Sequence, residues 1–478
     1  MKSSLARLVF PSLRFRPAHG GFAHERQKID TALRAGVGGF ILFGGDRASV
    51  ADLTAALRSG ADRPLLIGAD LERGPAQQVM GLTELPPPAA LGSLKDLEAT
   101  RTAGIITGAE ARSVGVNWAF APVADLDVEP ENPIVQTRSF GADPQTVSDH
   151  VAAWVQGCQD HGVLACAKHY PGHGRATEDS HITLPRVSTP VEELEGTDLV
   201  PFAAAVRAGV GSVMSAFVAY PQWDPTGRAA SFSPVILRYL RETLGFGGVI
   251  VTDALIMAGA TARERETSAT ATAVSAGCDG LLYPDDFARV VLALDRAVGR
   301  DLPVARADAA LARCEEAAAA WTTGADQGAP DLVAHAAFAD GVADRVISTV
   351  RGAVPALRAP LGLSIVDDDL GGPYVVGSRE VVAETLSAAG VATAPWGSAA
   401  RGVVLVFSEP RSWKGRADLG PGSLAQLQAL ASSAALVLLF AHPRLVGQIP
   451  GDAPVVCCWH GQALMQRAAA RWIAGKLG

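Results

Sequence analysis

Residues 168–185 form a short segment in which several side chains could move protons. The segment reads KHYPGHGRATEDSHITLP and contains three histidines, one lysine and two acidic residues, directly after an apolar run. Pro171, Gly172 and Gly174 prevent a regular helix over these residues. We therefore predict a loop at the carboxyl end of a buried strand.

Two kinds of chemistry could use this loop. In the first, Asp179 and His181 form a dyad, because residues two apart in an extended chain point the same way. The aspartate would fix the imidazole tautomer and raise its pKa, which suits a group that donates and later accepts a proton near neutral pH. In the second, the three histidines and Asp179 bind zinc, although the proline and glycines break the helix on which paired histidine ligands usually lie.

A second candidate is Asp253, which ends the apolar run GGVIVT and precedes a helix-like stretch. Such an aspartate could simply cap a helix. Cleavage of a glycosidic bond, however, needs a carboxylate that attacks or stabilises an oxocarbenium-like centre, opposite a proton donor. Asp253 and His181 would supply that pair.

Asp70 ends another apolar run, PLLIGA, and could bind the hydroxyl groups of a sugar. Glu72 and Arg73 follow it closely in the chain. We expect these two residues to form an ion pair that closes the loop. Such an ion pair accounts less easily for the presence of Asp70 at the end of the strand.

Eight apolar runs alternate with helix-like stretches in this part of the chain, and the candidate residues lie at or near the ends of these runs. This alternation predicts an α/β protein. The runs end near Phe10, Phe43, Asp70, Asp125, Lys168, Ser215, Asp253 and Tyr283. Eight parallel strands close a (β/α)₈ barrel, in which the carboxyl ends of the strands converge on one face. The polar residues at four of these ends favour a TIM-type barrel over an open, doubly wound sheet.

We expect the catalytic barrel over residues 1–325, a linker and bridging helix over residues 326–350, and a smaller α/β sandwich over residues 351–478. The stretch TTGADQGAP, which follows an alanine-rich helical segment, has the composition of a linker. Beyond it, four apolar runs predict the buried strands of the sandwich.

The C-terminal region offers no cluster comparable to the loop. Asp367, Asp368 and Asp369 are expected in a solvated turn after a strand. His442 and His460 follow strands, with no acid at motif spacing. We expect this domain to be structural or to shape substrate binding.

Composition limits the classes of partner. A formal net charge of −8 and 48% hydrophobic residues favour neither a nucleic-acid surface nor a disordered chain, so we expect a small-molecule partner. Charged residues and prolines interrupt the N-terminus before signal-peptide length, and the longest apolar run near the C-terminus is far short of the ~20 residues that span a bilayer. Six cysteines without paired spacing fit a reducing compartment. A cytoplasmic protein with no membrane partner is expected.

The three segments together resemble family 3 glycoside hydrolases, and within them the β-N-acetylglucosaminidases. The loop matches the pattern K-H-[FY]-P-G-H-G-x4-D-S-H, and residues 252–257 match [ST]-D-x-L-x-M. Asp70, the R-S-F of residues 138–140 and the two-domain layout extend the resemblance across most of the barrel.

The resemblance implies a retaining mechanism through a covalent glycosyl-enzyme, with no cofactor and no metal. Asp253 would be the nucleophile, and His181, supported by Asp179, would be the acid/base. The sugar would be bound by Asp70, Arg138, Lys168 and His169. The implied activity is exo-acting hydrolysis that removes terminal β-linked N-acetylglucosamine.

Several alternatives stay open. A phosphorylase of the same family would use phosphate instead of water, and a histidine acid/base repels phosphate less than a carboxylate would. A β-glucosidase or β-xylosidase would not need the 2-acetamido group, and a silent sugar-binding protein is disfavoured by the intact acidic residues and histidine. The natural substrate could be a muropeptide from peptidoglycan recycling, a chitin fragment or a glycoconjugate.

One position departs from the pattern D-x-E-G-G-x-V-x-R of recycling-type relatives. Counting from Asp70, Gln78 replaces the final arginine. Hydrogen bonds from a neutral amide are weaker than those from a guanidinium. We therefore expect weaker or differently shared sugar binding, with Arg73 or Arg138 as substitutes.

Overall fold

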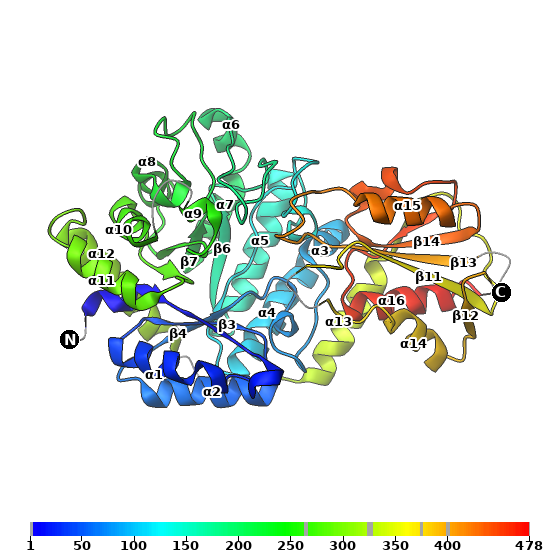
Figure 1. Cartoon of the computed structure of the whole chain (residues 1–478), viewed down its shortest axis with the longest axis horizontal. Coiled ribbons are helices and arrows are strands. Elements are labelled where there is room, and N and C mark those ends of the chain that lie inside the picture. The colour runs from blue at the N-terminus through cyan, green and yellow to red at the C-terminus, as the bar shows by residue number, and fades with distance from the viewer. Residues whose placement is uncertain (1–2, 262–265, 323–327, 373–375, 398–401, 478) are drawn as a thin grey trace.

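Eight parallel strands form a closed barrel in the N-terminal part of the chain (Figure 1). The computed structural model describes residues 3–261, 266–322, 328–372, 376–397 and 402–477. The strands of the barrel are β1 (Val9–Phe10), β2 (Ser12–Arg14), β3 (Gly39–Phe43), β4 (Leu66–Ala69), β5 (Trp118–Ala119), β6 (Leu164–Tyr170), β7 (Ser212–Ser215), β8 (Val249–Thr252) and β9 (Leu281–Leu282). Each of the eight predicted runs is present, with β1 and β2 as two halves of the first.

The first strand closes the barrel because its two halves pair on opposite sides. Pro11 separates β1 from β2. β1 pairs with β9, and β2 pairs with β3, both in parallel. A bridge between Val251 and Gly280 joins β8 to the start of β9. The predicted barrel is therefore confirmed.

Aromatic side chains fill the barrel interior. Trp118 of β5 is fully buried and packs edge-on against Phe10 and Phe120, with ring centroids 5.2 and 4.8 Å away. Its indole Nε1 donates to Ser212 Oγ of β7, at 2.8 Å. Since β6 lies between β5 and β7 in the sheet, this hydrogen bond crosses the interior and ties non-adjacent strands together.

Helices surround the barrel on its outer side. They are α1 (Arg26–Ala35), α2 (Arg47–Gly60), α3 (Pro88–Leu94), α4 (Leu97–Ser113), α5 (Pro144–Gln159), α6 (Val191–Gly196), α7 (Val200–Arg207), α8 (Pro234–Arg238), α9 (Ala258–Thr261), α10 (Glu266–Ala276), α11 (Phe287–Ala297) and α12 (Val304–Thr322). Aspartate side chains accept hydrogen bonds from backbone N–H groups at the start of several of them. These caps are Asp46, Asp96, Asp143 and Asp286.

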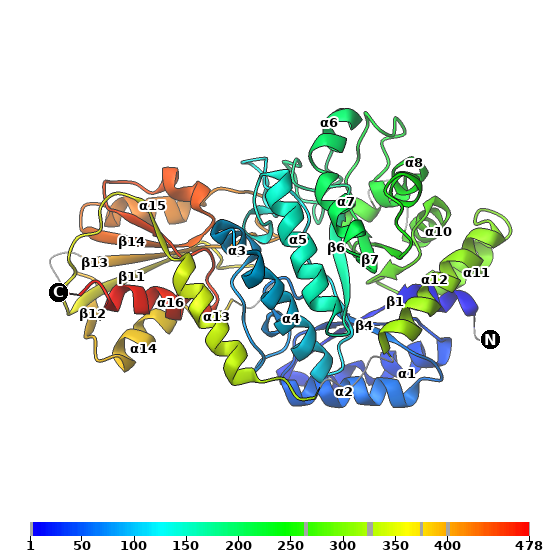
Figure 2. The same ribbon diagram turned by 180° about the vertical axis from the view of Figure 1, so that it is seen from behind.

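Helices α4 and α5 lie against each other on the back of the molecule, with α13 (Leu332–Val346) beside α4 (Figure 2). Their backbones approach closely because glycine stands at the contact. A Cβ at Gly104 would lie only 2.4 Å from the carbonyl oxygen of Trp154. This packing fixes the segment between the two helices, which carries β5, Asp125 and Arg138.

The C-terminal domain is a six-stranded sheet between helices. Its strands are β10 (Ser348–Arg351), β11 (Leu361–Asp367), β12 (Thr393–Pro395), β13 (Gly402–Ser408), β14 (Ala434–Ala441) and β15 (Val455–Cys457). The order is β10-β15-β14-β13-β11-β12, with β10 antiparallel and the rest parallel. Helices α14 (Val381–Ala388) and α16 (Ala463–Ala474) cover one face, and α15 (Pro421–Leu430) covers the other (Figure 1). The predicted α/β sandwich is confirmed.

The sequence missed β10 and β12 in this sheet. Most of their residues are exposed or half-buried, so neither strand has the apolar run that marks the other four. The predicted boundary between residues 325 and 326 lies outside the described residues, and the other domain limits stay predictions. No helix in the described ranges is both long and apolar enough to span a bilayer.

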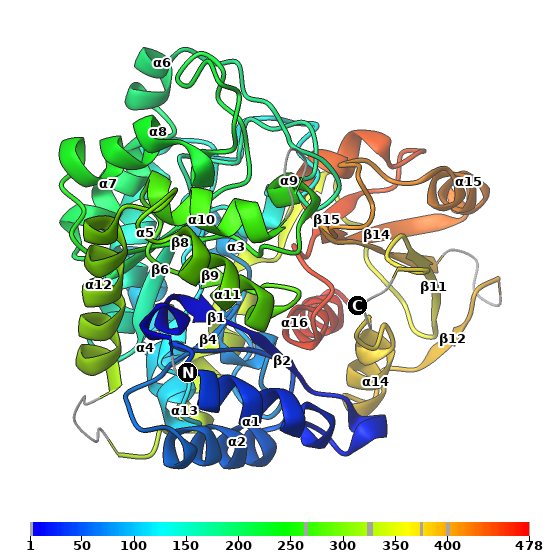
Figure 3. The same cartoon turned by 60° about the vertical axis from the view of Figure 1, so that its left-hand side comes forward.

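The second domain packs against the side of the barrel (Figure 3), and α13 lies along the boundary between them (Figure 2). Arg444 forms an ion pair with Asp127 of the barrel. Gln462 donates to the carbonyl oxygen of Leu85 at 2.7 Å, and the backbone N–H of Leu464 donates to Glu84 at 2.6 Å. These polar contacts bring the ends of the C-terminal strands close to the barrel mouth.

Candidate active site

A cleft of about 830 Å³ opens where the barrel strands end. It brings together residues that lie far apart in the sequence. Of the predicted site residues, it is lined by Asp70, Arg138, Lys168, His169, His181 and Asp253. The seventh, Asp179, is buried directly behind His181. The predicted side chains thus share one site.

Asp253 follows β8 and is held through its backbone and one carboxylate oxygen. Its backbone N–H donates to the carbonyl oxygen of Ser215 at 3.1 Å, and the N–H of Ala254 donates to Oδ1 at 2.7 Å. The next helix begins only at Ala258, so Asp253 is not a helix cap. No other partner of this carboxylate is found among the described residues, which leaves Oδ2 free to meet a ligand.

Asp179 and His181 form the predicted dyad, but in a turn rather than in an extended chain. Asp179 Oδ1 lies 2.7 Å from His181 Nδ1 and also accepts the backbone N–H of His181 at 2.8 Å. Such an Asx-type turn points the aspartate at a neighbour two residues on. The Nδ1–H therefore faces the aspartate, while the ring, with 40% of its side chain exposed, presents Nε2 to the cleft.

The other two histidines of the loop have different partners, and the zinc alternative loses its ligand set. His169 Nδ1 lies 2.6 Å from Asp125 Oδ2, and His173 Nε2 lies 3.0 Å from Ser180 Oγ. Burial lowers the pKa of His173 to about 4, so that ring is neutral. Within the described ranges, no three His, Cys, Asp or Glu side chains could hold a metal ion together.

A buried ion network lies in the same cleft as Asp253 and His181, at the carboxyl ends of β4 and β6. Lys168 Nζ lies 2.7 Å from Asp70 Oδ1 and 2.7 Å from Glu72 Oε1. Arg138 binds Glu72 through two hydrogen bonds of 2.7 and 2.9 Å. The expected pair between Glu72 and Arg73 was wrong, because Glu72 turns to the two buried cations instead.

The charges of this network stay in place because each offsets the cost of burying the other. Burial would raise the pKa of Glu72, but Arg138 and Lys168 hold it well below its ordinary value. Burial would lower the pKa of Lys168, but Asp70 and Glu72 raise it. Glu72 is therefore an ionised acceptor, and the lysine stays a cationic donor beside the cleft.

Asp125 is a functional residue that the sequence marked only as a strand end. It is fully buried, and its Oδ1 accepts the backbone N–H groups of His169 and His173 at 3.1 and 2.6 Å. Burial alone would raise the pKa of Asp125, but His169 and His173 hold it below its ordinary value, so the carboxylate is ionised. Gly174 completes the fit, since a Cβ there would lie 1.7 Å from the carbonyl oxygen of Leu126. Asp125 thus shapes the loop that carries the dyad.

Gln78 and Arg73 differ from what their spacing predicts. Gln78 Oε1 accepts the backbone N–H of Gly44 at 3.0 Å, so this amide holds a neighbouring loop at the cleft wall. The side chain of Arg73 extends to His460 of the C-terminal domain. Neither residue could be placed from sequence, because both partners lie on other elements.

The cleft also includes residues from the second domain. Gly377 and Arg411 line it together with the barrel residues. Neither residue is marked by a local sequence signal, because their position depends on how the two domains pack. The C-terminal domain is therefore part of the cleft wall, as expected for a domain that shapes substrate binding.

Comparisons with known proteins identify the family of the barrel domain. Residues 5–316 match the family model described as the glycosyl hydrolase family 3 N terminal domain. A β-hexosaminidase of Thiobacillus denitrificans is 38% identical over 285 residues, which cover 57% of this chain and 78% of that protein. A β-hexosaminidase of Chromobacterium violaceum is 40% identical over 269 residues, or 54% of this chain and 74% of that protein.

A solved structure extends the likeness to both domains. The family 3 β-N-acetylglucosaminidase from Paenibacillus sp. str. FPU-7 superposes with a TM-score of 0.88 at 27% identity, covering 100% of this chain and 97% of that one. The family match covers more than half of the chain and contains every predicted site residue. The chain belongs to glycosyl hydrolase family 3.

Proposed function

We propose that this protein is an exo-acting, retaining β-N-acetylglucosaminidase that forms a covalent glycosyl-enzyme on Asp253. The observation that carries the proposal is the arrangement of the cleft: a carboxylate with one free oxygen and a histidine backed by a buried aspartate line the same space. These are the two groups that a retaining glycosidase needs.

In the first step, Asp253 attacks the anomeric carbon as the bond from that carbon to the leaving-group oxygen breaks. Protonated His181 gives its Nε2 proton to that oxygen, while its Nδ1–H stays on Asp179. The carboxylate of Asp179 stabilises the imidazolium before the transfer and fixes the ring in the productive orientation.

In the second step, neutral His181 removes a proton from water through Nε2. The water oxygen bonds to the anomeric carbon, and the bond to Asp253 breaks, which restores both groups. Two displacements at the same carbon keep the β configuration.

The ion network beside the nucleophile suits recognition of the sugar. Asp70, with 31% of its side chain exposed, can accept hydrogen bonds from hydroxyl groups. Lys168 and Arg138 can donate to hydroxyl and acetamido oxygens. His169, whose Nδ1 faces Asp125, can accept from a hydroxyl group at Nε2, which lies 3.5 Å from Arg138 Nη2. Because hydrogen bonds to charged groups are the stronger ones, a few such contacts can hold one sugar ring in place.

The relatives support the same activity and sugar. Two that are 38 and 40% identical carry the name β-hexosaminidase, and the superposed structure is named a β-N-acetylglucosaminidase. We also propose a cytoplasmic location, which rests on the cysteines: all six are buried as free thiols in the described part of the chain.

A panel of nitrophenyl glycosides at pH 5 to 8 tests the proposal. We expect turnover of the β-N-acetylglucosaminide to exceed that of the β-glucoside and β-xyloside, with free N-acetylglucosamine released in the β form. Assays with and without inorganic phosphate distinguish a hydrolase from a phosphorylase, since the latter would release the sugar 1-phosphate. Equal turnover of the β-glucoside, or phosphate-dependent turnover, would contradict the proposal.

A further inference from the structure

The cleft continues into a second pocket on the side of the C-terminal domain. This pocket has a volume of about 330 Å³. Residues common to both walls are Arg73, Ala76, Gln77, Gly377 and Arg411. Two arginines, one from each domain, therefore stand where the two spaces meet.

Arg73 reaches this junction without an acceptor for its guanidinium. The backbone N–H of Gln462 donates to His460 Nδ1 at 3.1 Å, so Nδ1 carries no hydrogen and Nε2 must carry one. The Nε2 nitrogen of His460 lies 3.3 Å from Glu409 Oε2, the acceptor that its hydrogen faces. Arg73 contacts the same Nε2, which cannot accept its hydrogen. In the described ranges, no carboxylate lies within ion-pair distance of Arg73.

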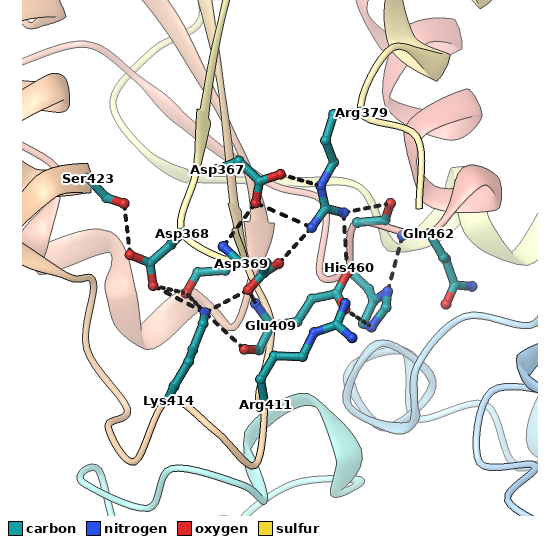
Figure 4. Close-up of polar contacts among 12 residues, drawn as sticks. Asp367, Asp368, Asp369, Arg379, Glu409, Arg411, Lys414, Ser423, His460 and Gln462 are labelled. Carbon is teal, nitrogen blue, oxygen red and sulfur yellow. Dashed lines mark hydrogen bonds and ion pairs between the residues drawn. The ribbon is translucent and has the colours of Figure 1, made fainter. Parts of the chain in front are cut away.

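Arg411 is also incompletely paired. Its Nη2 donates to Glu409 Oε2 at 2.6 Å, but its Nε is buried and has no partner among the described residues. Glu409 is shared, because Arg379 and His460 face the same carboxylate (Figure 4). One carboxylate therefore serves several positive or hydrogen-donating groups, and the junction carries an excess of donors.

The segment that carries Arg411 is rigidly held. The backbone N–H of Glu409 donates to Asp369 Oδ1 at 3.0 Å, and Lys414 Nζ lies 2.6 Å from the same oxygen (Figure 4). Lys414 also pairs with Asp368 at 3.1 Å. The sequence predicted a solvated turn for the three aspartates, but they are turned inward because Lys414 pairs with Asp368 and Asp369 and Arg379 pairs with Asp367. The arginine is therefore held in position before any ligand arrives.

This segment lies on the acid/base side of the cleft. A Cβ at Gly415 would come within 3.3 Å of Ile182 Cδ1, and Ile182 directly follows His181. The group that His181 protonates belongs to the leaving group. The junction is therefore next to the part of the substrate beyond the scissile bond.

We propose that Arg73 and Arg411 form a subsite for an oxyanion on the leaving-group side of the cleft. The inference rests on the proposed function and adds to it the charge of the group beyond the sugar. The oxyanion is either a carboxylate of the leaving group or free phosphate. Each guanidinium is a planar fork of N–H donors, which matches the oxygens of a carboxylate and of a phosphate alike.

The test compares two aryl β-N-acetylglucosaminides whose leaving groups differ only by a carboxylate or a carboxamide. We expect the wild type to favour the carboxylate in kcat/KM. Arg411→Gln and Arg73→Gln should each reduce kcat/KM for the carboxylate about tenfold more than for the carboxamide, because each loses a charge-assisted hydrogen bond. A selective loss of this kind assigns the subsite to the leaving group.

Inorganic phosphate is the second probe, used with the carboxamide glycoside. If phosphate is the ligand, it forms the sugar 1-phosphate: a phosphate oxygen bonds to the anomeric carbon as the bond to Asp253 breaks. Both arginine variants should then raise the phosphate concentration needed for half-maximal product about tenfold. This result assigns the subsite to phosphate, and it means that the protein is a phosphorylase and not a hydrolase.

Arg444→Gln is the matched control. Arg444 also joins the two domains, through Asp127, but lines neither pocket. It should leave the preference between the glycosides unchanged. If both arginine variants keep the wild-type carboxylate preference and phosphate response, the subsite is overturned. If the wild type cleaves neither glycoside, the proposed function itself fails.

Discussion

The molecule contains two buried ion networks of similar composition but different use. At the barrel mouth, Lys168 and Arg138 hold Glu72 while Asp70 stays partly exposed in the cleft. In the C-terminal domain, Arg379 and Lys414 bind the three aspartates at the end of β11, and those carboxylates are buried. The first network leaves Asp70 accessible to a ligand. In the second, Arg379 and Lys414 donate to carboxylates within the network.

The difference shows that a buried charge cluster marks a binding site only where one side remains open. Burying ions is costly unless each has partners, and both networks meet that requirement. Only the barrel network adds a partly exposed acceptor in the same cleft as Asp253, the proposed nucleophile. Substitutions in the two networks should therefore separate loss of catalysis from loss of stability.

The largest effect is expected for Asp253→Asn. This change removes the attacking carboxylate, so kcat should fall by more than about 10³-fold. The melting temperature should stay close to that of the wild type, because Asp253 is half-exposed and belongs to neither network. A 5-fluoro glycoside should label this residue in the wild type, as mapped by peptide sequencing. Label on another acid would contradict the assignment.

His181→Ala should slow cleavage by about 10²- to 10⁴-fold for substrates with poor leaving groups. Good leaving groups depart without a proton, so their loss should be smaller. Asp179→Asn should reproduce part of the effect, because it removes the acceptor that orients the ring. Activity lost with a chelator and restored by zinc would instead favour the metal alternative.

Arg379→Met should act on stability rather than on chemistry. It removes the partner of Asp367, Asp369 and Glu409 and leaves their carboxylates buried without it. We expect the free energy of unfolding to fall by about 3–5 kcal/mol, measured by urea denaturation. The kcat of the folded enzyme should change only a few-fold. A loss of kcat comparable to that of Asp253→Asn would mean that the second network takes part in catalysis.

The smallest effect is expected for Gln78→Arg. The change removes the acceptor of the Gly44 N–H and adds a cation at the cleft wall. It should therefore alter KM more than kcat and leave the pH profile nearly unchanged. A displaced pH optimum would place Gln78 beside the reacting bond instead of at the sugar's hydroxyl edge.

The sequence predicted the elements whose signals are local. The barrel strands are apolar runs that end in polar residues, and the loop that carries the proposed acid/base dyad is marked by its glycines and histidines. Asp179 and His181 were predicted as a pair, but an Asx-type turn, not an extended chain, brings them together. The type of contact was thus predictable and its geometry was not.

Contacts between distant segments escaped prediction. Glu72 was paired with its sequence neighbour Arg73, yet it binds Arg138, which lies 66 residues away. The role of Arg411 was not visible at all, since it depends on how one domain packs on the other. Where several partners of the right charge exist, only the fold decides which ones meet.

The closure of the barrel by β1 and β9 imposes an order on its assembly. β1 leaves the ribosome early, but its partner Leu281–Leu282 is made only after seven other strands. At roughly 5–20 residues per second, the wait is on the order of tens of seconds. During that time the nascent sheet has two open edges, at which other chains could pair. Completion of one short strand therefore ends the period in which the growing chain is most exposed to aggregation.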